Sequence, residues 1–284
     1  DYPLDWTDAW DVHSVREVSH ALWCEVNKSL DFPYEVAEDT IGGVPCERIR
    51  AIGVNPSGVT ILHFHGGMYC LGTPEIDRAL NAPIARNAGA EIISVDYRLA
   101  PEYPFPGALD DGLAVWSALI ADDRKLIILG ESAGGGLAAA VTIAARDRGL
   151  AMPAGLILIS PMLDLTGSSD SFTTLTKVDP DYGMNIEALL APGHAYAADM
   201  PLDHPLISPM YADHRGLPPT LIQVGNREVL LGDSTRFARA ARSADVDVRV
   251  QIQDAGWHNY PIWYGVPEAD AAITAIGNFI RHVT

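Results

Sequence analysis

The sequence places one serine, Ser132, between an apolar strand and an alanine-rich helix. Residues 125–129 form a mainly apolar run with the β-branched residues of a buried strand, and residues 137–146 have the composition of a helix. The spacing Gly130-x-Ser132-x-Gly134 is typical of a sharp strand-to-helix turn, in which the glycines let the two elements approach and the serine hydroxyl is exposed. We therefore predict that Ser132 is a nucleophile.

A serine nucleophile needs a histidine base, and in enzymes with this turn the base follows the serine in the chain. Five of the nine histidines follow Ser132. His258 comes after the last predicted strand, on a loop where the sheet can present it, so we predict that His258 is the base. The other four are expected at the surface or in the terminal helix: His194, His204, His214 and His282.

An acidic residue must orient the base, and we expect it in the loop after a strand predicted at 220–224. Glu228 stands just beyond that strand and is our candidate. Two alternatives remain open at this stage. Asp233 could be the N-terminal charge of the next helix, and Asp254 could close a turn before the histidine loop.

Two glycines, Gly66 and Gly67, follow a predicted apolar strand and could direct their backbone N–H groups at a substrate oxygen. Together with the N–H of Ala133 they would form an oxyanion hole with three donors. The rival interpretation of His63 and His65 is a metal site on one strand face. No carboxylate or further histidine lies close by in the sequence, so we expect no metal there and expect His65 to hydrogen-bond the loop.

An alternation of predicted strands and helices must position these residues. This alternation predicts an α/β fold with a mostly parallel sheet covered by helices on both faces. Residues 165–205 have no strand pattern and are too many for a plain connection, so we expect an inserted cap there. The predicted strands are a pair within 40–52, then 59–64, 91–95, 125–129, 156–159, 220–224 and 246–252, and the predicted helices lie within 1–30 and at 74–87, 107–121, 137–146 and 268–282.

The composition restricts the partners. The 284 residues suit one large domain, and the formal net charge of -18 opposes binding to nucleic acid or to anionic membranes. We expect a small neutral molecule as substrate and leave a homodimer open. The three cysteines, Cys24, Cys46 and Cys70, lack C-x-x-C spacing, and the first residues lack the pattern of a signal peptide, so we expect a cytoplasmic protein.

Five motifs together resemble one enzyme family. In chain order they are His-Gly-Gly at 65–67, Asp-Tyr-Arg-Leu-Ala-Pro-Glu with Pro-Phe-Pro at 96–106, Gly-Glu-Ser-Ala-Gly-Gly at 130–135, Ser-Pro-Met-Leu-Asp-Leu-Thr at 160–166, and the run 205–219. From about residue 40 onward the chain resembles the hormone-sensitive-lipase-like (bacterial family IV) branch of the α/β-hydrolases. The resemblance implies an eight-stranded core sheet within one α/β-hydrolase domain at 1–284. It also implies a helical cap built from about 1–30 and about 165–205, and ester hydrolysis without a cofactor.

The resemblance also bears on the site. The family's acid lies where Glu228 stands, usually as Asp. Met68 stands where the family usually has a third glycine, so we expect a narrow site that prefers small acyl groups and unhindered alcohols. The residues expected nearest the substrate are Met68, Tyr69, Trp23, Tyr182 and Met184.

We therefore predict a serine carboxylesterase in which Ser132 attacks the ester carbonyl, His258 relays the proton and Glu228 fixes the imidazole. A lactone hydrolase needs the same machinery and remains an alternative. A ligand receptor on the same fold is a further alternative, which the presence of all three residues disfavours. Four charged residues of the motifs are expected to hold loops in place: Asp96, Arg98, Glu102 and Asp164.

Overall fold

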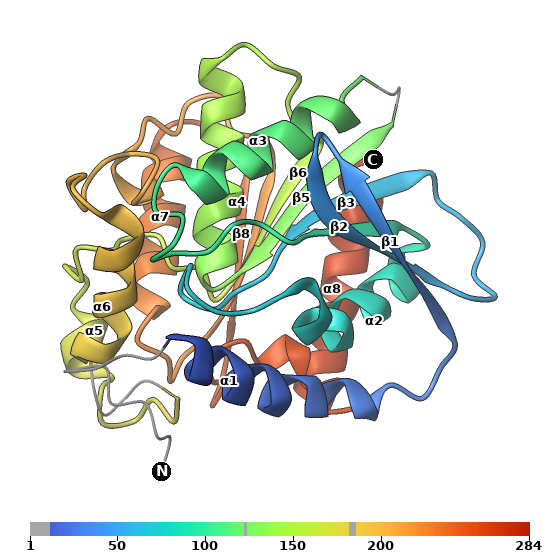
Figure 1. Ribbon diagram of the computed structural model, residues 1–284, viewed down its shortest axis with the longest axis horizontal. Helices are drawn as coiled ribbons and strands as arrows, with labels where there is room; N and C mark the ends of the chain where they lie inside the picture. The colour runs from blue at the N-terminus through green and yellow to red at the C-terminus, as the bar shows by residue number, and fades with distance from the viewer. Residues whose placement is uncertain (1–11, 122–123, 182–185) are drawn as a thin grey trace.

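The computed structural model describes residues 12–121, 124–181 and 186–284. Its centre is an eight-stranded sheet with the strand order β1-β2-β4-β3-β5-β6-β7-β8 (Figure 1). β2 runs antiparallel to both β1 and β4, and every pairing from β4 to β8 is parallel. The strands are β1 (Tyr34–Ile41), β2 (Val44–Ala51), β3 (Val59–Phe64), β4 (Glu91–Val95), β5 (Lys125–Glu131), β6 (Gly155–Ile159), β7 (Thr220–Gly225) and β8 (Val248–Gln253).

Helices cover both faces of this sheet. α2 and α8 pack on one face, and α3, α4 and α7 pack on the other. The helices are α1 (Val12–Val26), α2 (Arg78–Ala88), α3 (Gly107–Leu119), α4 (Ala133–Asp147), α5 (Ser171–Thr174), α6 (Ile186–Ala197), α7 (Leu231–Ser243) and α8 (Pro267–Val283), with short 3₁₀ turns η1 (Asn27–Ser29), η2 (Pro74–Asp77), η3 (Pro209–Tyr211) and η4 (Tyr260–Ile262). The predicted fold class is confirmed.

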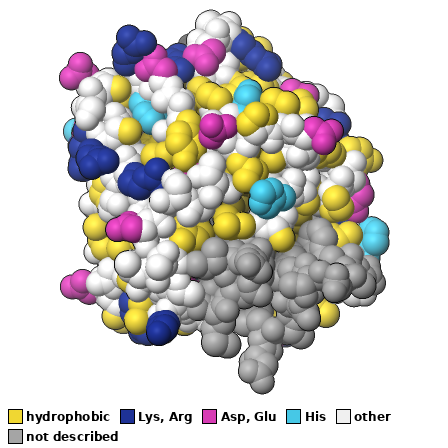
Figure 2. Space-filling model, turned by 90° about the vertical axis from the view of Figure 1, so that its left-hand side faces the viewer, with side chains coloured by type: hydrophobic (Ala, Val, Ile, Leu, Met, Phe, Trp, Pro, Cys, Tyr) yellow, Lys and Arg dark blue, Asp and Glu magenta, His cyan; other side chains and the backbone are white. Residues whose placement is uncertain are grey.

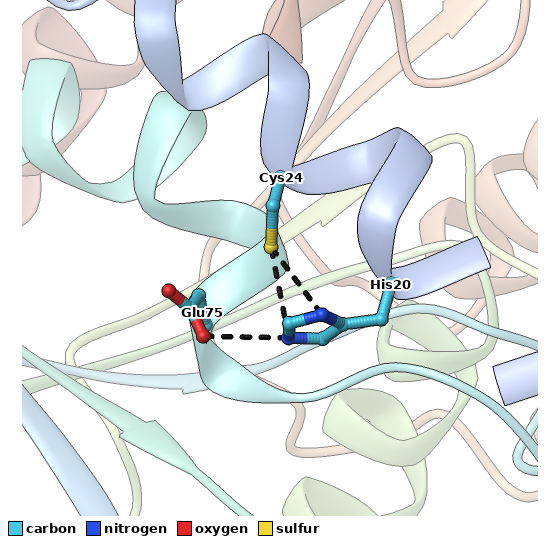
Figure 3. Close-up of side chains that lie close together, drawn as sticks. All are labelled: His20, Cys24 and Glu75. Atoms are coloured by element: carbon cyan, nitrogen blue, oxygen red, sulfur yellow. Dashed lines mark hydrogen bonds and ion pairs between the residues drawn. The ribbon is translucent and has the colours of Figure 1, made fainter. Parts of the chain in front are cut away.

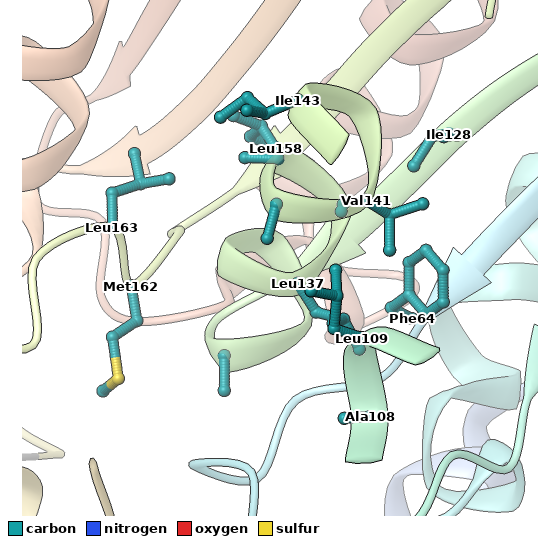
Figure 4. Packing of buried hydrophobic residues seen from close by; sticks show 14 of the residues in the cluster. Phe64, Ala108, Leu109, Ile128, Leu137, Val141, Ile143, Leu158, Met162 and Leu163 are labelled. Atoms are coloured by element: carbon teal, nitrogen blue, oxygen red, sulfur yellow. The ribbon is translucent and has the colours of Figure 1, made fainter. Parts of the chain in front are cut away.

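The central strands are buried over most of their length, and are mainly apolar, because helices cover both faces of the sheet. Every residue of β3, β6 and β7 is buried. On the α3–α4 face, Leu137 and Val141 of α4 lie among side chains that include Phe64 of β3 and Ile128 of β5 (Figure 4). This packed face supports the turn that carries Ser132.

The edge of the sheet differs in detail from the prediction. β1 begins at Tyr34, earlier than expected, because it pairs with β2 along its full length, from Tyr34 opposite Ala51 to Ile41 opposite Val44. The predicted helix at 74–87 begins instead with the 3₁₀ turn η2, followed by α2. Periodicity alone does not separate these two helix types at a proline-led start.

The N-terminal helix α1 is tied to the body through Arg16. Its guanidinium donates to the carbonyl oxygens of Cys70 and Ala100 at 2.8 and 2.9 Å, and it forms two 2.8 Å hydrogen bonds with the carboxylate of Glu102. The assignment of 1–30 and 165–205 to a cap stays a prediction. Residues 1–11 and 182–185 of these stretches, including Tyr182 and Met184, lie outside the described residues.

Two further features concern the cysteines and the helices. Cys24, Cys46 and Cys70 are all free thiols, and burial raises the pKa of both Cys46 and Cys70 to about 12. Within the described ranges, none of the helices combines the length and the apolar character needed to cross a membrane.

On the face formed by α5, α6 and α7, side chains of both charges are scattered among neutral ones (Figure 2).

Gly112 of α3 provides a test of this packing. Replacing a helical glycine by alanine normally favours folding by about 1 kcal/mol, but a Cβ at Gly112 would lie 2.7 Å from Cγ2 of Val141 and 3.1 Å from the ring of Phe64. We expect Gly112→Ala to reduce the free energy of unfolding by about 1–2 kcal/mol, because overpacking outweighs helix propensity. The measurement is urea unfolding.

The double variant Gly112→Ala/Val141→Ala is the control for this prediction. It removes the methyl group that the new Cβ meets, so it should be more stable than Val141→Ala alone. A Gly112→Ala variant that is as stable as the parent, or more stable, would contradict the packing described here.

Candidate active site

Ser132 lies at the corner between β5 and α4 and has φ 54 and ψ -123, which is a strained conformation for any residue with a side chain. A Cβ on Gly130 would overlap the carbonyl oxygen of Gly134, and one on Gly134 would overlap that of Phe64. The backbone N–H of Ser132 donates to the carbonyl of Ile159 at 2.9 Å. The two glycines are therefore required by the close approach of strand, helix and neighbouring loop.

Ser132, His258 and Glu228 form one hydrogen-bonded row. Nε2 of His258 lies 3.0 Å from Oγ of Ser132, and Nδ1 of His258 lies 2.8 Å from Oε2 of Glu228. The three follow β5, β8 and β7, and the carboxyl ends of these parallel strands meet at one edge of the sheet. Ser132 is 2% exposed, His258 7% and Glu228 0%, so the row is shielded from water.

The carboxylate of Glu228 is held on both oxygens. Oε1 accepts hydrogen bonds from the backbone N–H of Gly225 at 2.6 Å and from the hydroxyl of Ser160 at 2.7 Å, while Oε2 faces His258. Ser160 in turn accepts a hydrogen bond at 3.1 Å from the backbone N–H of Asn259, the residue after the histidine. Glu228 and the histidine loop are therefore fixed relative to each other.

The charge of Glu228 also acts on the histidine. Burial lowers the pKa of His258, but the hydrogen bond and the charge of Glu228, with smaller contributions from Asp181 and Glu131, raise it above its ordinary value. With Nδ1–H donating to Glu228, the lone pair of Nε2 faces the hydroxyl of Ser132. This is the arrangement that a base needs to accept the serine proton.

The two alternative acids are engaged elsewhere. Oδ2 of Asp233 accepts hydrogen bonds from the backbone N–H groups of Leu163 and Asp164 at 2.9 and 3.0 Å, and burial raises the pKa of Asp233 to about 8. Asp254 accepts a hydrogen bond from Nδ2 of Asn226 at 3.0 Å. Each therefore joins backbone segments or loops, and Glu228 alone among the three candidates contacts the histidine.

The loop after β3 corrects one predicted oxyanion donor. The backbone N–H of Gly66 donates to Oε1 of Glu131, so the prediction for Gly66 is wrong because its single hydrogen is already engaged. The N–H groups of Gly67, Met68 and Ala133 have no acceptor within the part of the chain that the structure describes. Met68 has φ 56, a left-handed conformation that favours glycine, so the backbone keeps the shape expected for a glycine there.

The apolar residues expected near the substrate have different surroundings. Tyr69 is 2% exposed, and its ring stacks on that of Tyr196 with a centroid distance of 3.9 Å. Met68 is also buried, and Trp23 is partly buried against the same core. These contacts give all three a packing role, and their contact with substrate stays a prediction.

Two histidines beside the loop are buried and neutral. Nδ1 of His65 lies 2.7 Å from the carbonyl oxygen of Gly66, which confirms the expected hydrogen bond to the loop, and burial lowers the pKa of His65 to about 4. Burial likewise lowers the pKa of His63 well below its ordinary value. His214, expected at the surface, is 5% exposed instead, because its ring packs against that of Phe237 in α7 at a centroid distance of 4.7 Å.

Three of the four charged motif residues hold loops, as predicted. Asp96 is the exception, since its side chain is exposed and has no hydrogen bond to any other described residue, while its backbone N–H donates to the carbonyl oxygen of Pro45. The three pairings are Glu102 with Arg16, Arg98 with Asp111, and Asp164 with Thr166, Ser168 and Arg236.

Four residues close to the site escaped the sequence analysis: Ser160, Asn259, Glu131 and Asp77. Glu131 carried a signal, because it is an ionisable residue at the end of a buried strand, directly before the nucleophile. Ser160 opens one of the motifs, and Asn259 follows the predicted base. Asp77 carried no local signal, since acidic residues are common at the start of a helix.

One group of described residues could offer three metal ligands: His20, Cys24 and Glu75 (Figure 3). Nε2 of His20 lies 3.3 Å from Oε2 of Glu75, whose Oε1 pairs with Arg78 at 3.0 Å. Sγ of Cys24 is nearly equidistant from the two ring nitrogens of His20, at 3.6 and 3.8 Å, so it lies beside the ring and not along one nitrogen lone pair. We therefore assign this group to the packing of α1 on η2.

Known proteins resemble this chain in both sequence and structure. Residues 61–262 match the family described as having the alpha/beta hydrolase fold. An esterase from Acinetobacter venetianus is 39% identical over 246 residues, covering 84% of this chain and 79% of that protein. An acetyl-hydrolase from Streptomyces hygroscopicus is 34% identical over 293 residues, covering 96% and 97%. A solved esterase of the bacterial hormone-sensitive lipase family has a TM-score of 0.89 at 34% identity, covering 98% and 93%.

The chain therefore belongs to the α/β-hydrolase fold family, in its hormone-sensitive-lipase-like branch of esterases. This confirms the resemblance seen in the motifs. The protein is an enzyme of the carboxylic ester hydrolase class.

The contacts of Glu228 lead to a test of its role as the residue that orients His258. Glu228→Gln keeps the size of the side chain but removes the charge that faces His258, so we expect kcat to fall at least about 100-fold through the wrong tautomer or orientation of the imidazole. Asp254→Asn is the matched control, because its side chain contacts Asn226 and not the histidine. Steady-state kinetics on a chromogenic ester would measure both, and a larger loss in Asp254→Asn would contradict the assignment.

Proposed function

We propose that this protein hydrolyses small carboxylic esters through an acyl-enzyme on Ser132, with His258 as general base and acid and Glu228 as the residue that orients it. The observation that carries this proposal is the row of hydrogen bonds of 3.0 and 2.8 Å joining the three side chains. The strained serine corner and the buried, doubly held carboxylate support it.

In the first half of the reaction, Nε2 of His258 takes the proton of the Ser132 hydroxyl as Oγ attacks the ester carbonyl. The carbonyl oxygen becomes an oxyanion, for which the N–H groups of Gly67, Met68 and Ala133 are the proposed donors. When the intermediate collapses, the imidazolium gives its proton to the departing alkoxide. The alcohol leaves, and the acyl group remains on the serine.

The second half repeats these steps with water. His258 takes a proton from a water molecule, the resulting hydroxide attacks the acyl carbonyl, and the imidazolium then returns a proton to Oγ of Ser132 as the acid leaves. Glu228 stays ionised throughout and stabilises the imidazolium that forms in each half. None of these steps requires a cofactor.

For the substrate, we propose an uncharged ester with a short acyl group and an unhindered alcohol. The net charge of -18 disfavours anionic substrates and nucleic acid. Relatives described as an esterase and an acetyl-hydrolase are consistent with a short acyl group. A lactone would use the same machinery. We also propose that the enzyme acts in the cytoplasm, which its three free thiols support.

A panel of linear esters and lactones, with Ser132→Ala as the blank, tests this function. We expect the parent to turn over ethyl acetate with a higher kcat/KM than tert-butyl acetate, and Ser132→Ala to lose on the order of 10⁴-fold in activity while remaining folded. Activity of Ser132→Ala within tenfold of the parent would refute the nucleophile. Higher kcat/KM for lactones than for every linear ester would favour the lactone alternative.

A further inference from the structure

A second buried acidic pair lies beside the Ser132–His258–Glu228 row. Glu131, the residue before the nucleophile, is 2% exposed, and Asp77 of η2 is 1% exposed. Each carboxyl group acts on the pKa of the other, so the two lie close together. Two carboxyl groups in such contact cannot both be ionised where water is excluded, so one of them holds a proton between them.

The hydrogen-bond partners favour ionisation of Glu131. Glu131 accepts from the backbone N–H of Gly66 on Oε1 and from Nδ2 of Asn259 on Oε2. By contrast, Oδ2 of Asp77 has no hydrogen-bond partner among the described residues, and Nε2 of the neutral His63 lies 3.7 Å away. Burial and the nearby charge of Glu131 raise the pKa of Asp77 well above its usual range. Burial raises the pKa of Glu131 as well, and we assign the shared proton to Asp77 because Glu131 accepts the two N–H donors.

The carboxylate of Glu131 contacts two loops that the reaction needs in register. One is the loop after β3, through Gly66, which precedes the proposed oxyanion donors. This approach is so close that a Cβ on Gly66 would overlap both oxygens of Glu131. The other is the loop after β8, through Asn259, which follows the base. The carboxylate also lies near enough to His258 for its charge to favour the imidazolium.

We propose that Glu131 and Asp77 are a positioning pair for ester hydrolysis. Ionised Glu131 joins the loop after β3, which carries the oxyanion donors, to the loop after β8, which carries His258, and it adds a second negative charge that stabilises the imidazolium. Protonated Asp77 holds Glu131 in place. This inference rests on the proposed function. It assigns to the pair a role in kcat and in the titration of His258, and not only a role in packing.

Three variants separate the effect of the negative charge of Glu131 from the effect of its hydrogen bond to Asn259. Glu131→Gln/Asp77→Asn replaces the pair with two amides that can still hydrogen-bond each other, so the shape stays and the charge is lost. Asp77→Asn alone keeps a donor for Glu131 and keeps its charge. Asn259→Ala breaks the tie to the histidine loop and leaves the charge in place.

The readout is kcat/KM as a function of pH on a neutral ester. Its acid limb reports the protonation of His258, whose neighbouring charged groups are Glu228, Asp181 and Glu131. We expect Glu131→Gln/Asp77→Asn to lower kcat/KM by about 100-fold and to move the acid limb about half a unit or more toward lower pH. Asn259→Ala should lower kcat/KM without moving the limb, and Asp77→Asn should lose less than tenfold.

Two controls make the result decisive. Near-ultraviolet circular dichroism verifies folding, and if the double variant does not fold, Glu131→Gln alone is judged on the same two readouts. The inference would be overturned if Glu131→Gln/Asp77→Asn kept the parental activity and its acid limb did not move. Ser132→Ala in the same assay separates the two proposals: if it remains active, the proposed function fails, and if it is inactive while the charge-free pair behaves as the parent, only the positioning pair fails.

Discussion

The left-handed backbone of Ser132, with φ 54 and ψ -123, is the constraint around which the site is built. Such a conformation persists only where the surroundings hold it. Here β5 enters the corner fully paired with β3 and β6, α4 leaves it, and the carbonyl of Ile159 accepts the serine N–H. Gly130 and Gly134 leave no room for a Cβ, so the close contact of strand, helix and loop enforces the turn.

The parallel sheet brings the histidine and the acid to the serine at this corner. The carboxyl ends of β5, β7 and β8 lie at one edge, so the residues that follow these strands meet although the chain separates them widely. In that dry setting each charge needs a partner. Glu228 has three hydrogen-bond partners, which are His258, Ser160 and the backbone N–H of Gly225, and Glu131 has the proton of Asp77 and two N–H donors. The charges of both carboxylates raise the pKa of His258 and so oppose the effect of its burial.

The sequence was informative where the determinants are local. An apolar run, a glycine-spaced serine and an alanine-rich helix are contiguous, so the Ser132 turn was predictable, and chain order reduced the histidines to His258. The errors arose where distant residues decide. Glu131, which ends the neighbouring strand, accepts the hydrogen bond of the Gly66 N–H that was predicted to face the substrate. Phe237 packs on His214, which was predicted at the surface because its neighbours in the sequence are polar. The pairing of Asp77 with Glu131 depends on tertiary contact and has no local pattern.

The central claim is that Ser132 is the nucleophile of this site. Diethyl p-nitrophenyl phosphate, which phosphorylates activated serines and releases p-nitrophenol, tests it directly when labelling is followed by peptide mass spectrometry. The account predicts one diethylphosphoryl group per chain, on the peptide that contains Ser132, with loss of esterase activity in proportion to labelling. Labelling of a different residue, or inactivation that leaves Ser132 unmodified, would contradict it.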